Sequence, residues 1–464
     1  MPEPGSMAVP AAPPQLRRDL GLWGAVAIVV GTVIGSGIFL VPKTMIQKVG
    51  SVETVFLVWI AAGILSLAGA LTYAELAASI SEAGGEYVYL REAYGPFFGF
   101  LYGWTQMWVA KSGSIATLAT GFFLYLANFF PGLESVLGSV GDGVWRVELR
   151  TGQLAAMGVI LSLGILNYFG VKVGGNVQIV VTIIKVACIL AIIGVGLLFA
   201  PQATTANLTS SIPASGGFVG FFAAMVAALW AYDGWNNVTM VASEIKNPQR
   251  NLPLALTAGT LAVVVLYLAT NLAYFYVLPA AAVAGSDRVA ATMMRQALGE
   301  WGAAAVSIAA MISIFAAING SILTGSRVPY AMAVDGLFMK SIKEVHPLYR
   351  TPANSILLMS GWSCVLILSG RYNELFELVI FASWILYAMA AASVIVLRRK
   401  RPDLVRPYKT IGYPVVPILF VLVALCLLGN TFVDSPRQSL LGLVLISTGF
   451  PFYFHWKRRL TGQK

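Results

Sequence analysis

Two apolar stretches of the chain are interrupted by glycine and polar residues, at residues 31–37 and 230–237. If each stretch is a membrane helix, the interruption leaves backbone N–H and C=O groups without helical partners, which a bilayer tolerates only where they line a cavity or bind a ligand. The N–H groups of Ser36 and Gly37 would begin a half-helix and suit a carboxylate. Carbonyl groups that end the preceding half-helices suit an ammonium group. One such site would bind both ends of an amino acid.

Close helix packing is the alternative explanation for the first interruption. Gly31 and Gly35 form a small-xxx-small pair, a pattern that brings membrane helices together. Ser36 and Gly37 follow directly, and the second stretch has its own polar interruption around Asp233. The two interruptions together favour a binding site.

Lys185 lies well inside a further apolar stretch, about nine residues or roughly 13 Å along its helix. An ionisable residue at this depth is costly and indicates a function, although a snorkelling side chain is the alternative. Two roles stay open. Lys185 could be a fixed cation that braces the broken first span in place of a bound sodium ion. Because loss of hydration favours the neutral amine, it could also carry a proton.

Four further side chains in apolar stretches of the chain are candidates for a functional or structural role. Asp233 either caps the half-helix that begins beside it or faces the pocket and favours a cationic substrate group, and both options stay open. Trp230, immediately before the interruption, is the better candidate for a gate over the substrate. Lys111 is expected to pair with an acid or brace the helix bundle, and Glu75 to contact a neighbouring helix end.

The composition identifies the elements that must position these residues as membrane helices. The chain of 464 residues is 58% hydrophobic and 11% charged, whereas about 25% of a soluble domain is charged. Such a chain cannot cover a water-facing surface, which excludes a soluble enzyme, a disordered chain and a nucleic-acid-binding protein. Its net charge of +10 fits the gathering of Lys and Arg on the cytoplasmic side of a membrane.

No metal, cofactor or catalytic residue is expected. The cysteines Cys188, Cys364 and Cys426 lie apart in apolar stretches, which disfavours a disulfide framework or a zinc site. The two histidines, His346 and His455, are far apart, and a metal site needs several clustered ligands. Without a nucleophile–base pair, the chain is not expected to be an enzyme.

Apolar stretches of roughly 20 residues predict an all-α polytopic membrane protein with twelve transmembrane helices. The expected spans are 21–41, 54–80, 97–128, 152–170, 176–199, 218–243, 254–278, 301–324, 353–369, 373–397, 414–432 and 438–456. With a cytoplasmic N-terminus, 20 of the 30 Lys and Arg residues fall in cytoplasmic segments. The positive-inside rule therefore predicts two cytoplasmic termini, in the plasma (inner) membrane.

The two interrupted spans, the first and the sixth, are five apart, which predicts two inverted repeats with a transporter binding site between them. The expected organisation is a disordered cytoplasmic tail at 1–17, a first five-helix repeat at 18–200, a second at 201–397, two accessory helices at 398–456 and a cytoplasmic tail at 457–464.

Several motifs resemble the L-type amino acid transporter (LAT) family of the amino acid–polyamine–organocation (APC) superfamily. They are TVIGSGIF at 32–39, the run 73–87, the runs 231–236 and 247–254, the run 319–327, and Arg406-Pro407. The likeness extends over about residues 18–456. It implies a LeuT-type fold, with ten core helices in two inverted repeats plus two more, and sodium-independent amino acid exchange by alternating access.

The resemblance also implies roles for single residues. Ser36 and Gly37 would bind the substrate carboxylate. Val33, Trp230 and Ala231 would offer carbonyl groups to the amine, with Trp230 as the gate. Lys185 would reach the Gly35 region and the eighth span near Ser321, with Asn236 as a further coupling or structural residue. Asp233 resembles the residue of members that accept dibasic as well as neutral amino acids.

One departure concerns partners. Eukaryotic members carry a cysteine between the third and fourth spans that bonds a single-span heavy subunit, and residues 131–150 contain none. We therefore expect a prokaryotic-type transporter without a disulfide-linked heavy subunit, whose partners are small L-amino acids and membrane lipid, and no nucleic acid. The alternatives are a proton-coupled symporter that uses Lys185, and a channel, although the filter loops or charged rings typical of channels are not apparent.

Overall fold

The computed structural model describes residues 15–140, 147–214, 216–368 and 372–461. Within these ranges the fold is almost entirely helical, as expected. Most of the predicted N-terminal tail, and the last three residues of the predicted C-terminal tail, lie outside the described residues.

The α-helices of ten or more residues are α1 (Leu22–Val33), α2 (Gly37–Val49), α3 (Val52–Ser79), α5 (Pro96–Thr105), α6 (Lys111–Leu126), α7 (Thr151–Tyr168), α8 (Val171–Leu198), α9 (Gly217–Tyr232), α10 (Pro248–Val277), α12 (Val289–Leu298), α13 (Glu300–Gly325), α15 (Ala353–Ile367), α16 (Tyr372–Lys400), α17 (Val415–Asp434), α18 (Pro436–Ser447) and α19 (Gly449–Thr461). The shorter elements are α4 (Glu86–Tyr94), α11 (Ala280–Ala284), α14 (Arg327–Val334), the π-helix η1 (Gln106–Ala110), and the 3₁₀ helices η2 (Pro131–Glu134), η4 (Thr205–Thr209), η5 (Trp235–Glu244) and η6 (Lys340–Lys343). The antiparallel strands β1 (Val136–Val140) and β2 (Val147–Arg150) form the two-stranded sheet.

Each of the twelve expected spans overlaps a described helix. By length and apolar composition, ten helical segments of the described chain could cross a membrane, and the bent pair α1–α2 makes an eleventh. The expected span 353–369 corresponds to α15, whose 15 residues give a helix of about 22 Å, shorter than the roughly 30 Å hydrocarbon core. The chain is therefore an integral multi-pass membrane protein, and the count of twelve spans stays a prediction.

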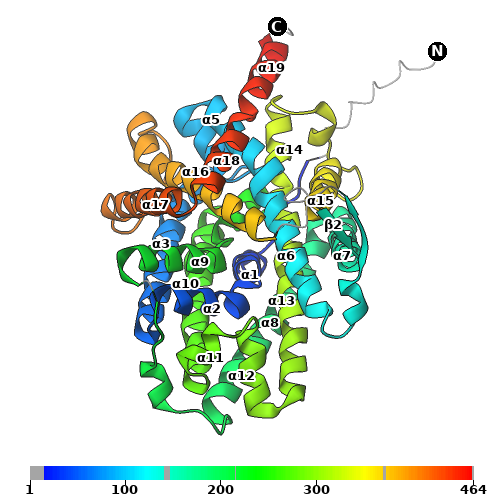
Figure 1. The fold of residues 1–464 in the computed structure, drawn as a ribbon. Coiled ribbons are helices and arrows are strands. Elements are labelled where there is room, and N and C mark those ends of the chain that lie inside the picture. The colour runs from blue at the N-terminus through cyan, green and yellow to red at the C-terminus, as the bar shows by residue number, and fades with distance from the viewer. Residues whose placement is uncertain (1–14, 141–146, 215, 369–371, 462–464) are drawn as a thin grey trace, which may run out of the picture.

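Helices at corresponding positions of the two expected repeats pack against each other: α3 against α10, α6 against α13, and α7 against α15. The broken spans meet in the same way, through α2 and α9. In Figure 1, α1 lies near the centre of the bundle, between α9 on one side and α13 and α6 on the other. The helix α1 contacts α8, α10 and α13, so it is enclosed by protein. The inverted relation of the two repeats stays a prediction.

Burial separates the lipid-facing side of a helix from its inner side. On α8, the apolar side chains of Val180, Ile183 and Leu190 are more than half exposed, whereas Lys185 has no exposed surface. Apolar side chains of this kind face hydrocarbon at no cost, while an ammonium group does not. The helix therefore turns its one buried charge toward α1.

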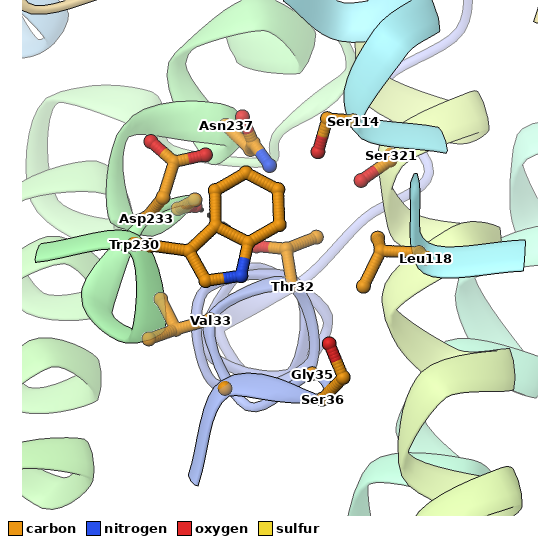
Figure 2. A pocket seen from close by; sticks show the side chains of 12 residues that line it. Thr32, Val33, Gly35, Ser36, Ser114, Leu118, Trp230, Asp233, Asn237 and Ser321 are labelled. Atoms are coloured by element: carbon orange, nitrogen blue, oxygen red, sulfur yellow. Dashed lines mark hydrogen bonds between the residues drawn. The ribbon is translucent and has the colours of Figure 1, made fainter. Parts of the chain in front are cut away.

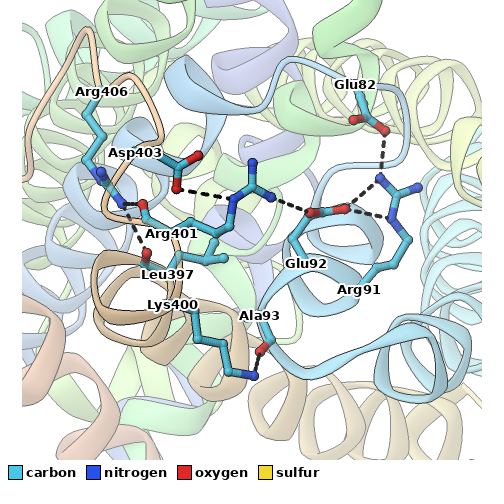
Figure 3. Close-up of polar contacts among 9 residues, drawn as sticks. All are labelled: Glu82, Arg91, Glu92, Ala93, Leu397, Lys400, Arg401, Asp403 and Arg406. Atoms are coloured by element: carbon cyan, nitrogen blue, oxygen red, sulfur yellow. Dashed lines mark hydrogen bonds and ion pairs between the residues drawn. The ribbon is translucent and has the colours of Figure 1, made fainter.

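One end of the bundle is held by charged side chains. Glu75 of α3 accepts two hydrogen bonds from Arg398 at the end of α16, at 2.8 and 2.7 Å, which confirms its expected contact with a neighbouring helix end. Figure 3 shows how α4 is joined to the same end of α16. Glu92 lies between Arg91, at 3.1 Å, and Arg401, at 3.5 Å. Lys400 donates to the Ala93 carbonyl at 2.8 Å.

Candidate functional site

The first predicted interruption is a break between two half-helices. The helix α1 ends at Val33, α2 begins at Gly37, and the two axes differ by 41°. Gly37 is required here, because a Cβ atom at this position would lie 2.7 Å from Cα and Cβ of Ala231 on α9. The N–H groups of Gly37 and Ile38 begin α2 and have no intrahelical acceptor, whereas that of Phe39 donates to the Ser36 carbonyl oxygen at 3.1 Å. The first two N–H groups form one wall of a site at the N-terminus of a helix, where an anion is favoured.

The second interruption is a break of a different geometry. The helix α9 ends at Tyr232, Asp233 is extended, and Gly234 has a φ of 107°, which favours glycine. The chain continues as the 3₁₀ helix η5. The hydroxyl of Thr32 lies 2.9 Å from the Gly234 carbonyl oxygen. The two breaks are therefore in direct contact.

Both breaks line one small cavity, shown in Figure 2. Its lining comprises Thr32, Val33, Gly35, Ser36, Gly37, Ser114, Leu118, Trp230, Asp233, Gly234, Asn237 and Ser321. The cavity volume of 20 Å³ accommodates about one water molecule. The indole of Trp230 lies across the cavity between the first break and Asn237 (Figure 2). An amino acid therefore fits only after Trp230 or its neighbours move.

Ser36 presents an unused polar atom to this cavity. Its side chain is 1% exposed, and among the described residues its hydroxyl has no hydrogen-bond partner. Most buried polar side-chain atoms in proteins are hydrogen-bonded, since an unsatisfied one costs about 1–3 kcal/mol. A ligand carboxylate at the start of α2 would supply the missing acceptor.

Two predicted site residues lie behind the lining. The carbonyl oxygen of Ala231 is 2.8 Å from the Tyr267 hydroxyl, and the same hydroxyl is 3.1 Å from the Val33 carbonyl oxygen. Ala231 is not part of the cavity wall. Asn236 also points away, and donates to the buried carboxylate of Glu86. Its neighbour Asn237 lines the cavity instead, because consecutive side chains of a 3₁₀ helix point about 120° apart.

Asp233 lines the cavity, as the second of the two options left open by the sequence requires. Asp233 directly precedes Gly234, the N-cap of η5, and its side chain forms part of the cavity wall. Its carboxylate accepts a 2.8 Å hydrogen bond from the hydroxyl of Tyr387 on α16 and lies beside Asn237 (Figure 2). A cationic side chain of a ligand would find this carboxylate at the edge of the cavity.

Lys185 holds the C-terminal end of α1. Its ammonium group donates to the carbonyl oxygens of Gly31 at 2.8 Å, Ile34 at 2.5 Å and Ser313 at 3.0 Å. The expected contact with the broken first span is therefore present. On the eighth span, however, the partner is Ser313 rather than Ser321. The two serines are eight residues apart, about 12 Å along α13, and Ser321 lines the cavity instead.

Lys111 contacts η5 rather than an acid. Its ammonium group donates to the Asn237 side-chain oxygen at 2.6 Å, and the structure shows no ion pair of Lys111 with a described carboxylate. This contact fits the bracing role expected from the sequence. Ser114 and Leu118, one and two turns further along α6, reach the cavity wall, and sequence reasoning missed both, because a serine in an apolar helix is ordinary.

Two ion pairs involve elements at opposite ends of the bundle, where Figure 1 shows α14 near the top and α11 and α12 near the bottom. At one end, Arg327 of α14 binds Glu244 of η5 through two hydrogen bonds of 2.7 and 3.0 Å, and both side chains are fully buried. At the other, Lys43 of α2 contacts Asp287 at 2.5 Å. The hydrogen bond from Lys43 lowers the pKa of Asp287. These two ion pairs therefore join α14 to η5 and α2 to the segment between α11 and α12.

A bundle of membrane helices, two of them broken around a buried polar cavity, defines a membrane transporter of the kind that binds its substrate between repeats. The chain matches the profile of the family described as amino acid permease over residues 20–453. It is 33% identical over 453 residues to the serine/threonine exchanger SteT of Bacillus subtilis (strain 168), which covers 96% of this chain and 98% of that protein. It therefore belongs to the amino acid permease family, within the LAT branch of the APC superfamily.

Other relatives carry related names. The b(0,+)-type amino acid transporter 1 of Homo sapiens is 34% identical, with 95% of this chain and 89% of that protein covered. The cystine/glutamate transporter of Homo sapiens is 30% identical, with 95% and 85% covered. These names describe transporters, which supports a function in transport rather than in catalysis.

Proposed function

We propose that this protein is a sodium-independent amino acid exchanger that works by alternating access. The substrate carboxylate would bind the hydroxyl of Ser36 and the N–H groups at the start of α2. The amine would bind the carbonyl groups of Val33 and Trp230, and that of Ala231 once it separates from the Tyr267 hydroxyl, and Trp230 would close over it. The unsatisfied hydroxyl of Ser36 beside a helix N-terminus is the single observation that carries this assignment.

The contacts at opposite ends of the bundle suggest how access alternates. Opening one side would separate Lys43 from Asp287, and opening the other would separate the segment before α1 from η5 near Glu244. The backbone N–H of Leu20 donates to the Glu244 carbonyl at 3.0 Å, so a movement of α1 away from η5 would break this hydrogen bond. Bound substrate would favour closure by joining the two breaks.

The contacts of Lys185 support its role as a fixed cation over its role as a proton carrier. A protonated lysine has three N–H donors, and three carbonyl oxygens accept from Lys185. A neutral amine has only two N–H donors and could not make all three contacts. A permanent ammonium group would stabilise the carbonyl oxygens at the end of α1, as a bound sodium ion would. This supports sodium independence.

We further propose that the exchanger acts without a disulfide-linked heavy subunit, in a plasma (inner) membrane, with both termini cytoplasmic. The three cysteines are free and belong to the helices α8, α15 and α17. Neutral L-amino acids are the expected substrates. Because Asp233 faces the cavity, dibasic amino acids are further candidates.

Transport in reconstituted vesicles tests the proposal. Uptake of labelled serine should require an amino acid inside the vesicle and should not change when sodium is replaced by choline or when a pH gradient is imposed. Uptake into empty vesicles driven by an inward proton gradient would instead identify a symporter. A panel of twenty amino acids competing with labelled serine would define the substrates.

A further inference from the structure

Lys111 is a second buried lysine, and the function proposed above assigns it no role. It is 4% exposed and begins α6 directly after the π-helical turn η1. Single π-helical turns within α-helices are frequent at functional sites. The ammonium group donates to Asn237 at 2.6 Å, and Asn237 lines the substrate cavity. A fixed positive charge therefore lies one side chain away from the cavity.

The aliphatic stem of Lys111 is held in place. A Cβ atom on Gly325, at the end of α13, would lie 2.5 Å from Cγ of Lys111, so the stem packs against the backbone of that helix. Of the three donors of an ammonium group, only one has a hydrogen-bond acceptor among the described residues. Lys111 is thus held close to the cavity with N–H donors that have no acceptor among the described residues, whereas Lys185 has three acceptors.

Two carboxylates belong to the same part of the site as Lys111, since Asp233 lies beside Asn237 in the cavity wall (Figure 2) and Glu86 accepts a hydrogen bond from Asn236. Asp233 lies at the cavity edge, and Glu86 is fully buried, where it accepts from Tyr102 at 2.9 Å. Charges interact far more strongly in such a site than in water. The presence or absence of one cation therefore changes how well the site tolerates a further charge on the substrate.

We propose that Lys111 determines the charge preference of the substrate site by offsetting the carboxylate of Asp233. Beside an uncompensated buried carboxylate, a dibasic amino acid would bind far better than a neutral one. With Lys111 in place, part of that advantage is removed, and a neutral amino acid binds without leaving a lone negative charge. This inference rests on the proposed function, because it concerns the amino acid site.

Charge-removing variants of Lys111 test the proposal in vesicles loaded with serine. In Lys111→Met, which keeps the length of the stem, the ratio of serine to arginine half-inhibition constants should rise about tenfold, equivalent to 1.4 kcal/mol. Lys111→Arg should keep the wild-type ratio, and so should Lys172→Met, which removes an exposed lysine of α8. A ratio in Lys111→Met within about twofold of wild type would overturn the proposal.

A second variant, which removes the carboxylate of Asp233, also tests the effect of the Lys111 charge. Asp233→Asn leaves Lys111 without the cavity carboxylate, so glutamate should become a competitor, and it should cease to compete in the double variant Asp233→Asn/Lys111→Met. Failure of Asp233→Asn to bind glutamate would overturn the proposal, even if Lys111→Met does not fold. Equilibrium binding of labelled arginine, serine and glutamate to purified protein gives these ratios without exchange. A failure of the exchange mechanism is thereby distinguished from a failure of the role of Lys111.

Discussion

The ammonium group of Lys185 donates a 2.8 Å hydrogen bond to the carbonyl oxygen of Gly31, 154 residues earlier in the chain. This contact joins the fifth predicted span to the last turn of α1, where carbonyl groups lose their helical partners. The hydroxyl of Ser313 supports the same turn, at 3.0 Å from the Ile34 carbonyl oxygen. The break in the first span is therefore stabilised from two other helices.

Replacement of Lys185 by Ala should reduce exchange at least about tenfold and lower the melting temperature, since each buried carbonyl left unpaired costs about 1–3 kcal/mol. Exchange of labelled serine, normalised to the amount of folded protein, measures the first effect. Lys172→Ala, at an exposed lysine of the same helix, is the matched control. Wild-type turnover in Lys185→Ala would remove this residue from the mechanism.

Gly37→Ala should abolish substrate binding, because the new Cβ atom would lie 2.7 Å from the backbone of Ala231 and would push the two breaks apart. Gly158→Ala is the control, since a Cβ atom there meets nothing within 4 Å. Binding of labelled serine to the purified variants measures the effect. If Gly37→Ala binds serine as the wild type does, the carboxylate site lies elsewhere.

Asp233→Gly should reduce arginine and lysine uptake by at least about tenfold, equivalent to 1.4 kcal/mol, and spare serine uptake. The carboxylate faces the cavity, and among the described residues the Tyr387 hydroxyl is the side-chain donor that the substitution leaves without its acceptor. Competition against labelled serine gives both values in one assay. A parallel fall of neutral and cationic uptake would mean that Asp233 is structural.

Glu244→Gln should destabilise the protein by about 3–5 kcal/mol, because it leaves the fully buried guanidinium of Arg327 without a counter-charge. The double variant Glu244→Leu/Arg327→Met should recover much of the stability, since no buried charge remains. Thermal unfolding followed by size-exclusion chromatography measures both variants. Equal destabilisation of the single and double variants would argue against this explanation.

The ion pair between Lys43 and Asp287 should not respond to pH in the physiological range. Because Lys43 lowers the pKa of Asp287, the carboxylate stays ionised at neutral pH, and the pair breaks only as the pH falls through that low pKa. Exchange should therefore show no pH dependence from this pair between about pH 5 and 8. A fall in wild-type exchange over this range that Asp287→Asn removes would contradict the prediction.

The positions of the two breaks can be predicted from the sequence, because glycine and polar residues interrupt apolar runs there. Gly37 and Gly234 stand where a side chain would collide with another helix or where the backbone needs a positive φ. Both are flanked by apolar runs long enough to cross a membrane. Polar residues and glycine inside such runs can be recognised without knowledge of the fold. The depth of Lys185 within its span is equally visible.

Only the tertiary structure shows which side chains contact each other across the site. Asn237 rather than Asn236 faces the cavity because the rotation of η5 is set by the helices around it, and Lys185 meets Ser313 rather than Ser321 because the height of α13 relative to α8 is set by packing. Composition and local pattern thus determined a membrane transporter with two broken spans. Contacts between residues more than one hundred positions apart depend on how helices rotate and slide against each other, so only the folded bundle decided which side chains form the site.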